Sequence, residues 1–257
     1  MSAVVACRNV WKSYHLRRPM GVKALMVGRK AAAETRFSRE WALKDVSFTV
    51  ARGQAFGVLG HNGSGKTTLL SVLLGTVGVD RGRVDLRGRV ASLLELGAGF
   101  HPDLTGRENA LLLGSILGMR LAEIRRRFDA ILEFSELDGA IDNPLRIYSA
   151  GMIVRLGFSI IIHSPADIFL IDEVLGVGDA RFQDKCRRHL LDFKKRNGTL
   201  IIVSHNMKEL AEVCDEAICL DLGHVIDQGP VGGVIDRHVA RMTAPEKGEP
   251  KGRAAAA

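Results

Sequence analysis

The chain has 257 residues, of which 46% are hydrophobic, and it carries a formal net charge of +7. This is enough for one large domain, or two small ones, with a buried core. Apolar runs such as 160–162 and 200–203 fall far short of the roughly 18 residues of a membrane span. The first residues show no signal-peptide pattern, and four scattered cysteines without a CxxC pair favour a reduced, cytosolic protein.

The spacing of apolar residues predicts strands and helices along the whole chain. We expect strands at 3–10, 46–50, 54–59, 84–87, 90–95, 167–172, 199–204, 216–221 and 224–227, and helices at 66–75, 106–118, 121–135, 149–163, 181–196 and 206–213. The central strands are continuous apolar runs, which is typical of a parallel sheet covered on both faces. Helices fill residues 106–142, between the sheet strands, and the composition of the tail 244–257 predicts disorder.

The excess positive charge gathers in an insert at 15–40, between the first two strands. Residues 17–39 of this insert hold a single acidic residue, Glu34, against seven basic ones: Arg17, Arg18, Lys23, Arg29, Lys30, Arg36 and Arg39. Charge of this kind suits either nucleic acid or the anionic inner face of a membrane. Charge alone does not choose between these partners.

Residues 60–67 form a complete phosphate-binding loop of the pattern G-x-x-x-x-G-K-[ST]. A strand-like run precedes the loop and a helical run follows it, which is the context that this motif requires. The glycines let the backbone wrap a phosphate, and the N-terminus of the helix favours an anion. We therefore expect a nucleotide to contact Gly60, His61, Asn62, Gly63, Ser64, Gly65, Lys66, Thr67 and Thr68. Lys66 would reach the β- and γ-phosphates, and the Thr67 hydroxyl would ligate Mg²⁺.

A second candidate site follows the apolar strand at 167–172, which ends in two adjacent carboxylates. Sheets of this type bind ligands at the carboxyl ends of their strands. Asp172 is placed to hold Mg²⁺ through water, and Glu173 to polarise the attacking water as a general base. By itself the pair could be a solvated acidic turn. Its occurrence together with the phosphate loop favours a nucleotide-hydrolysing site.

Two further elements are ambiguous when each is taken alone. His205 follows the strand at 199–204 and could hydrogen-bond a γ-phosphate, although a histidine at a strand end is more often structural. Ser149 and Gly151 open the helix at 149–163, where small residues can bind an anion. The same serine could be an ordinary helix N-cap.

Taken together, the order and spacing of these motifs resemble an ATP-binding-cassette (ABC) ATPase over nearly all of residues 1–240. The resemblance implies an α/β fold with a P-loop nucleotide-binding domain at 1–243. That domain would comprise a RecA-like mixed sheet core, an antiparallel β subdomain and a helical subdomain at about 103–163. The resemblance also implies ATP and Mg²⁺ as cofactors, and ATP hydrolysis at sites shared between two cassettes in a head-to-tail homodimer.

The resemblance assigns roles to particular residues. Ser149 and Gly151 would contact the γ-phosphate bound by the partner cassette, although this signature departs from the standard LSGGQ at positions 148, 150 and 152. Asp179 matches the loop that couples the two cassettes, and His205 matches the switch histidine of the family.

Two positions of the family pattern are less well defined in this chain. The glutamine expected after the strand at 90–95 is missing, and Glu95 is the nearest candidate for contact with Mg²⁺ or its water. Tyr14 and Trp41 both lie near the position of the aromatic ring that stacks on adenine. Either ring could stack, so the choice between them stays open.

Four segments, 95–102, 104–109, 148–152 and 172–182, resemble the subfamily that exports O-antigen, capsule and teichoic acid. The resemblance implies a separate membrane-spanning permease and a location at the cytoplasmic face of the bacterial inner membrane. It also places a helix of the basic insert against that membrane, although an ordinary basic loop remains an alternative. Export of another cargo, such as a lipid or drug, is a second alternative. A clamp on nucleic acid is disfavoured, because the basic residues form no groove with interleaved aromatics.

Overall fold

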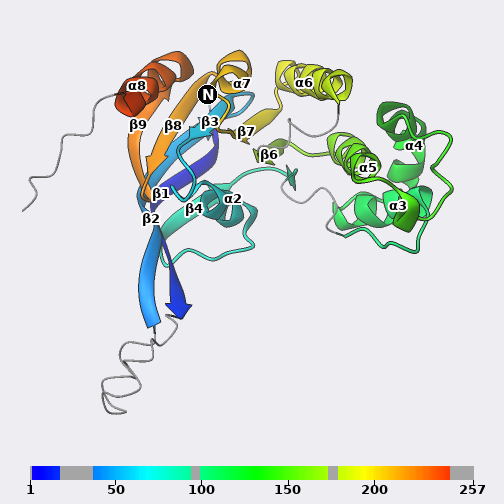
Figure 1. The fold of residues 1–257 in the computed structure, drawn as a ribbon, viewed down its shortest axis with the longest axis horizontal. Coiled ribbons are helices and arrows are strands. Elements are labelled where there is room, and N and C mark those ends of the chain that lie inside the picture. Colours follow the sequence, from blue (N-terminus) through cyan, green and yellow to red (C-terminus); the bar gives the residue numbers. More distant parts are fainter. Residues whose placement is uncertain (1, 18–36, 94–98, 173–178, 244–257) are drawn as a thin grey trace, which may run out of the picture.

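The computed structural model describes residues 2–17, 37–93, 99–172 and 179–243. The predicted insert helix and the predicted disordered tail lie outside these ranges. Within them, the chain forms two sheets and a group of helices set to one side (Figure 1). None of the helices in the described part of the chain is both long and apolar enough to cross a membrane.

The larger sheet has six strands in the order β5-β6-β7-β3-β8-β9. Its members are β5 (Val90–Ser92), β6 (Ile168–Asp172), β7 (Thr199–Val203), β3 (Ala55–Leu59), β8 (Glu216–Asp221) and β9 (His224–Pro230). Neighbours pair in parallel except β8 and β9, which form an antiparallel hairpin. The parallel pairing brings the carboxyl ends of β3, β6 and β7 to one edge, where a ligand site is expected.

Alternate residues of the central strands enter two different cores. Phe169, Leu200 and Ile202 pack with α5 (Ala150–Ile162), α6 (Ala180–Lys195), α7 (Met207–Val213) and α8 (Val231–Thr243). Phe56 and Ile201 belong to the other core, which includes α2 (Lys66–Leu74) and the smaller sheet. The sheet is therefore covered on both faces, as its apolar strands predict. Helix α8 was not among the expected helices, because a Gly-Gly pair lies near its start and it buries only Val231 and Val234.

The smaller sheet is antiparallel, in the order β2-β1-β4, and consists of β1 (Ala3–Arg17), β2 (Phe37–Ala51) and β4 (Arg81–Leu86). Both β1 and β2 extend well beyond the predicted strands and protrude as a long hairpin (Figure 1). The expected insert at 15–40 therefore begins and ends within strands. Cross-strand contacts explain the extension, since the rings of Trp11 and Trp41 pack edge to face with centroids 5.2 Å apart.

The helices α3 (Gly106–Ile116), α4 (Leu121–Ser135) and α5, with a 3₁₀ turn at Leu145–Ile147, enclose a third core. Thr105 begins α3 with a capping box: its hydroxyl accepts from the backbone N–H of Glu108, whose carboxylate accepts from the Thr105 N–H. Helix α5 belongs to this core through Leu156 and Ile160 and to the sheet through Phe158. The first turn of α5 is thereby fixed relative to both parts of the molecule.

Candidate functional site

The loop at 60–67 joins strand β3 to helix α2, as the sequence predicts. Its three glycines have φ values that side-chain-bearing residues rarely adopt: 147° at Gly60, 81° at Gly63 and 108° at Gly65. Two of them also lie too close to other backbone for a Cβ atom. A Cβ on Gly60 would lie 2.4 Å from the carbonyl oxygen of Leu220, and one on Gly65 would lie 2.5 Å from that of Ala42. The packing of β2 and β8 thus requires glycine at both positions.

Lys66 lies inside this loop and is 7% exposed. Its ammonium donates to the carbonyl oxygens of Gly60, at 2.7 Å, and His61, at 3.0 Å. The Ser64 hydroxyl is buried in the same loop and has no hydrogen-bond partner among the described residues. The loop therefore presents a concave backbone with a buried cation, an arrangement suited to phosphate oxygens.

The loop opens onto a cleft of about 280 Å³ lined by Ala42, Asn62, Gly63, Gly65, Lys66, Thr67, Thr68 and Asp172. Asp172 reaches it from the carboxyl end of β6, far away in the sequence. The cleft therefore combines an ammonium, a hydroxyl and a carboxylate, and the two oxygen donors suit Mg²⁺. Glu173 and Glu95, the predicted general base and substitute Mg²⁺ ligand, lie outside the described residues.

His205 is exposed and follows strand β7 at the same edge of the sheet. Val203, two residues earlier, pairs with Asp172 across the β6–β7 ladder. His205 does not line the cleft, so its contact with a γ-phosphate stays a prediction.

The two candidate adenine-stacking rings lie on paired strands of the long hairpin. Trp41 directly precedes Ala42 of the cleft, but the Arg39 guanidinium lies 4.3 Å from its ring centroid. Tyr14 is 39% exposed, with the Lys12 ammonium 5.6 Å from its ring centroid. Neither ring lines the cleft, and the choice between them stays open.

Ser149 and Gly151 lie in a separate place, at the start of α5. The Ser149 hydroxyl caps the helix by accepting from the Met152 N–H at 3.2 Å. Both residues line a second cavity, of about 580 Å³, together with Glu136, Arg155 and Asp179. The structure thus brings Ser149, Gly151 and Asp179 together, but not with the phosphate loop of their own chain.

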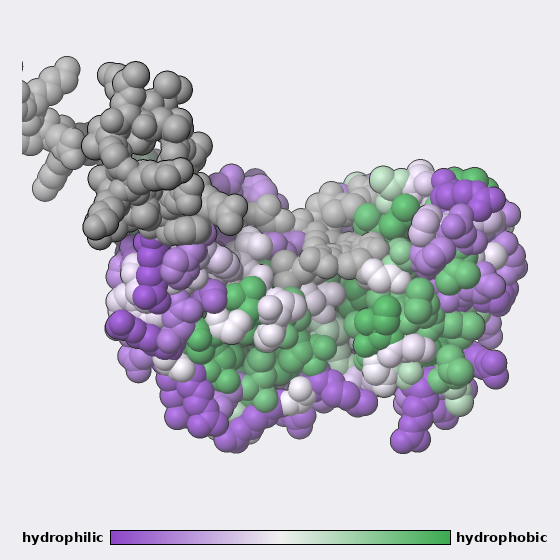
Figure 2. Space-filling model, turned by 90° about the horizontal axis from the view of Figure 1, so that it is seen from below, coloured by the Kyte–Doolittle hydropathy of each residue, from purple (hydrophilic) through white to green (hydrophobic). Residues whose placement is uncertain are grey.

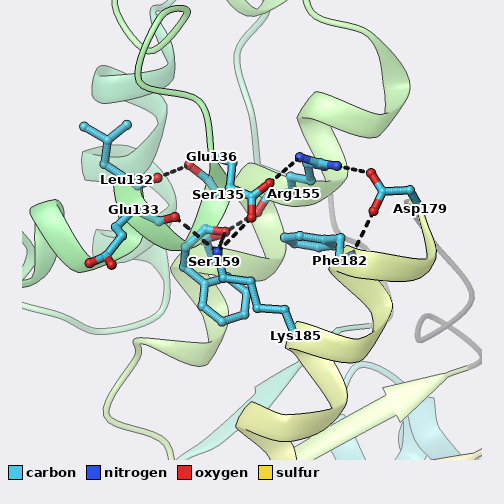
Figure 3. Close-up of polar contacts among 10 residues, drawn as sticks. Leu132, Glu133, Ser135, Glu136, Arg155, Ser159, Asp179, Phe182 and Lys185 are labelled. Atoms are coloured by element: carbon cyan, nitrogen blue, oxygen red, sulfur yellow. Dashed lines mark hydrogen bonds and ion pairs between the residues drawn. The ribbon is translucent and has the colours of Figure 1, made fainter.

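A polar network joins three helices beside this second cavity (Figure 3). Arg155 of α5 contacts the carboxylates of Glu136, at 3.1 Å, and Asp179. Lys185 of α6 also contacts Glu136, at 3.1 Å, and donates to carbonyl oxygens at the end of α4. Glu136 adopts a left-handed conformation, with φ of 57°, where these two cations meet.

The network keeps both of its carboxylates ionised. Lys185 lowers the pKa of Glu136 chiefly through its hydrogen bond. The pKa of Asp179 is lowered first by the Phe182 N–H, which its carboxylate caps at 2.9 Å, and then by Arg155. Sequence reasoning missed Glu136, Arg155 and Lys185, because no local pattern indicates which charges meet across three helices.

These features define a class of protein: a parallel strand, a glycine-rich phosphate loop, a helix, and a carboxylate from another strand make a P-loop nucleotide-binding domain. A family model described as "ABC transporter" matches residues 43–176, more than half of the chain. The chain belongs to this family, and it is an ABC ATPase that binds ATP.

Similar proteins come from several bacteria. The chain is 43% identical over 245 residues to an "O-antigen export system ATP-binding protein RfbB" of Klebsiella pneumoniae, covering 94% of this chain and 100% of the relative. It is 36% identical to a "Teichoic acids export ATP-binding protein TagH" of Lactiplantibacillus plantarum, covering 91% of this chain and 64% of the relative.

Solved structures support the fold. The ATP-binding subunit of an ABC transporter superposes with a TM-score of 0.72 at 20% identity, covering 94% of this chain and 95% of the other. A dimeric ATP-binding cassette bound to ADP and Pi, MJ0796, gives 0.69 at 21% identity, covering 88% of this chain and 98% of the other. The predicted ABC fold, with its mixed sheet core, antiparallel β subdomain and helical part, is confirmed.

Proposed function

We propose that this chain is the ATP-hydrolysing subunit of a bacterial transporter that exports a lipid-linked surface polysaccharide. One observation carries the proposal: the similarity to the O-antigen export protein extends over 94% of this chain and the whole of that relative. A relative named for teichoic acid export supports the same class of cargo. The motif segments at 95–109, 148–152 and 172–182 agree with it.

The hydrolytic chemistry that we propose uses the first cleft. Lys66 would exchange its carbonyl partners for the β- and γ-phosphates, which are stronger acceptors. Thr67 and Asp172 would hold Mg²⁺, which supplies charge neutralisation at the phosphates. Glu173 would take the proton of the attacking water, and His205 would contact the γ-phosphate from the neighbouring strand.

We further propose that two copies of the chain complete each site. Ser149, Gly151 and Asp179 line a cavity separate from the phosphate loop of their own chain, so a nucleotide that contacts them there would be one held by a second copy. ATP would then join the two cassettes, and hydrolysis would release them.

A permease is the second proposed partner. The helical part of the molecule, on the right in Figure 2, carries a broad apolar surface. Its most exposed large apolar side chains are Leu112, Ile116, Leu121 and Ile147, with 36–64% exposure. Contiguous exposed apolar surface marks an interaction site. We place a membrane-spanning subunit here, with the chain on the cytoplasmic face of the inner membrane and the basic insert near its lipid headgroups.

The test is mass spectrometry of lipid extracts from cells in which Glu173 is replaced by Gln. A blocked polysaccharide exporter should accumulate a diphospholipid-linked glycan, whose mass would identify the cargo. A Lys66→Ala strain is the matched control, since it blocks the same cycle at ATP binding and should accumulate the same lipid. Intact surface glycans without accumulation in both strains would reject polysaccharide export and favour a lipid or drug cargo.

A further inference from the structure

The side chain of His61, inside the phosphate loop, makes two short contacts that the loop motif does not require. Its Nδ1 lies 2.6 Å from the carbonyl oxygen of Asn62. Its Nε2 lies 2.6 Å from a carboxylate oxygen of Asp221, at the end of strand β8. The ring therefore links the phosphate loop to the β8–β9 turn.

These contacts favour one protonation state of the ring. A carbonyl oxygen can only accept a hydrogen bond, so Nδ1 carries a proton. An ionised carboxylate can also only accept, so Nε2 carries a proton as well. Only the imidazolium form of His61 donates through both nitrogens, so the two contacts together favour that form. The pKa of His61 is raised accordingly, first by the Asn62 carbonyl and then by Asp221.

The β8–β9 turn supports the phosphate loop at a second point. The Gly223 N–H donates to the Ser64 carbonyl at 3.0 Å, and the Gly223 carbonyl accepts from the Lys44 N–H at 2.8 Å. Leu222, between Asp221 and Gly223, has a φ of 45°, which is uncommon for a side-chain-bearing residue. The β8–β9 turn therefore contacts the phosphate loop through one backbone hydrogen bond, from Gly223 to Ser64, and one side-chain contact, between Asp221 and His61.

The charged and titratable groups near His61 and its partner Asp221 come from four elements. Asp221 favours the protonated ring, whereas the Lys66 ammonium of α2 lowers the pKa of His61 by repulsion. His238 of α8 is the third group, and its pKa is lowered chiefly by burial. His224 pairs with Asp221 across the β8–β9 ladder. When phosphates neutralise Lys66, the repulsion at His61 is relieved, so nucleotide binding and protonation of His61 favour one another.

We propose that protonated His61 is a positioning residue that holds the phosphate loop on the β8–β9 turn in its ATP-binding shape. ATP affinity then falls as the pH rises and His61 loses its proton. Because the pKa of His61 is raised, its contact with Asp221 is fully formed below the ordinary pKa of histidine. The contact is lost as the pH rises through the raised pKa of His61. Because His61 and Asp221 are both about half exposed, we expect a change of only about threefold to fivefold in affinity.

The test measures ATP affinity by calorimetry between pH 6 and pH 9, in the Glu173→Gln background to prevent turnover. ATP itself titrates in this range, so each variant is compared with the unsubstituted His61 protein at the same pH. His61→Gln should remove the His61-dependent loss of affinity. Asp221→Asn should move the loss to lower pH, because a neutral amide no longer favours the cation. His224→Gln is the matched control and should leave the profile unchanged.

A spectroscopic measurement keeps the proposal testable if a variant folds poorly. NMR of the His61 ring in the otherwise native protein should show titration above the ordinary histidine range, and a further rise when ATP binds, as reciprocity requires. An affinity ratio between the native and His61→Gln proteins that is flat with pH would overturn the proposal. So would a His61 titration that ATP does not move.

Discussion

Replacing Gly65 by alanine should disrupt the phosphate loop far more than the loss of one flexible residue would explain. Gly65 has a φ of 108°, and a Cβ there would lie 2.5 Å from the Ala42 carbonyl oxygen, which is held in β2. Ordinary contact would require a displacement of about 1 Å. Misplacement of that size at a reacting centre costs about a hundredfold in rate. We expect Gly65→Ala to lower ATP turnover by about this factor.

Gly75→Ala is the matched control. Gly75 ends α2 with a φ of 76°, and a Cβ there would meet nothing within 4 Å. The Gly75→Ala variant should therefore lose only about 1–2 kcal/mol of stability, the cost of a left-handed conformation for a residue with a Cβ atom, and its ATP affinity should be unchanged. The assays are thermal unfolding, calorimetric ATP binding and steady-state ATPase for both variants. Native-like turnover in Gly65→Ala would refute the argument, because it would show that the Ala42 backbone moves and the loop keeps its shape.

Three further predictions concern other parts of the molecule. Glu173→Gln should retain ATP binding and trap an ATP-dependent dimer on size-exclusion chromatography, and full turnover would overturn its role as general base. Arg155→Ala should lower the unfolding temperature near neutral pH, with Arg155→Lys intermediate. The difference should vanish as the pH falls and both carboxylate partners protonate. Their pKa values are lowered in the folded protein, so the ion pairs with Arg155 stabilise the fold only while the carboxylates are ionised. Charge reversal at Arg29, Lys30 and Arg36 of the basic insert should impair export but spare basal ATPase activity. Unchanged export would reject the membrane role of the insert.

Much of the site could be predicted because its chemistry is encoded in contiguous residues. The loop at 60–67 and the acidic end of strand β6 are each set by a few neighbouring residues. The parallel sheet follows from the apolar strands, which must be buried on both faces. Parallel pairing then brings Asp172 to the phosphate loop, because both lie at the carboxyl edge of one sheet.

Other features were decided only by the tertiary structure. The extension of the β1–β2 hairpin depends on cross-strand pairs such as Trp11 and Trp41, and helix α8 is held by packing on the sheet. The attachment of His61 to Asp221 joins residues that no periodic pattern relates. Periodicity and local motifs predict which way a residue faces within its own helix or strand. They do not predict which distant side chain that residue contacts, because the contact depends on how the helices and strands pack against one another.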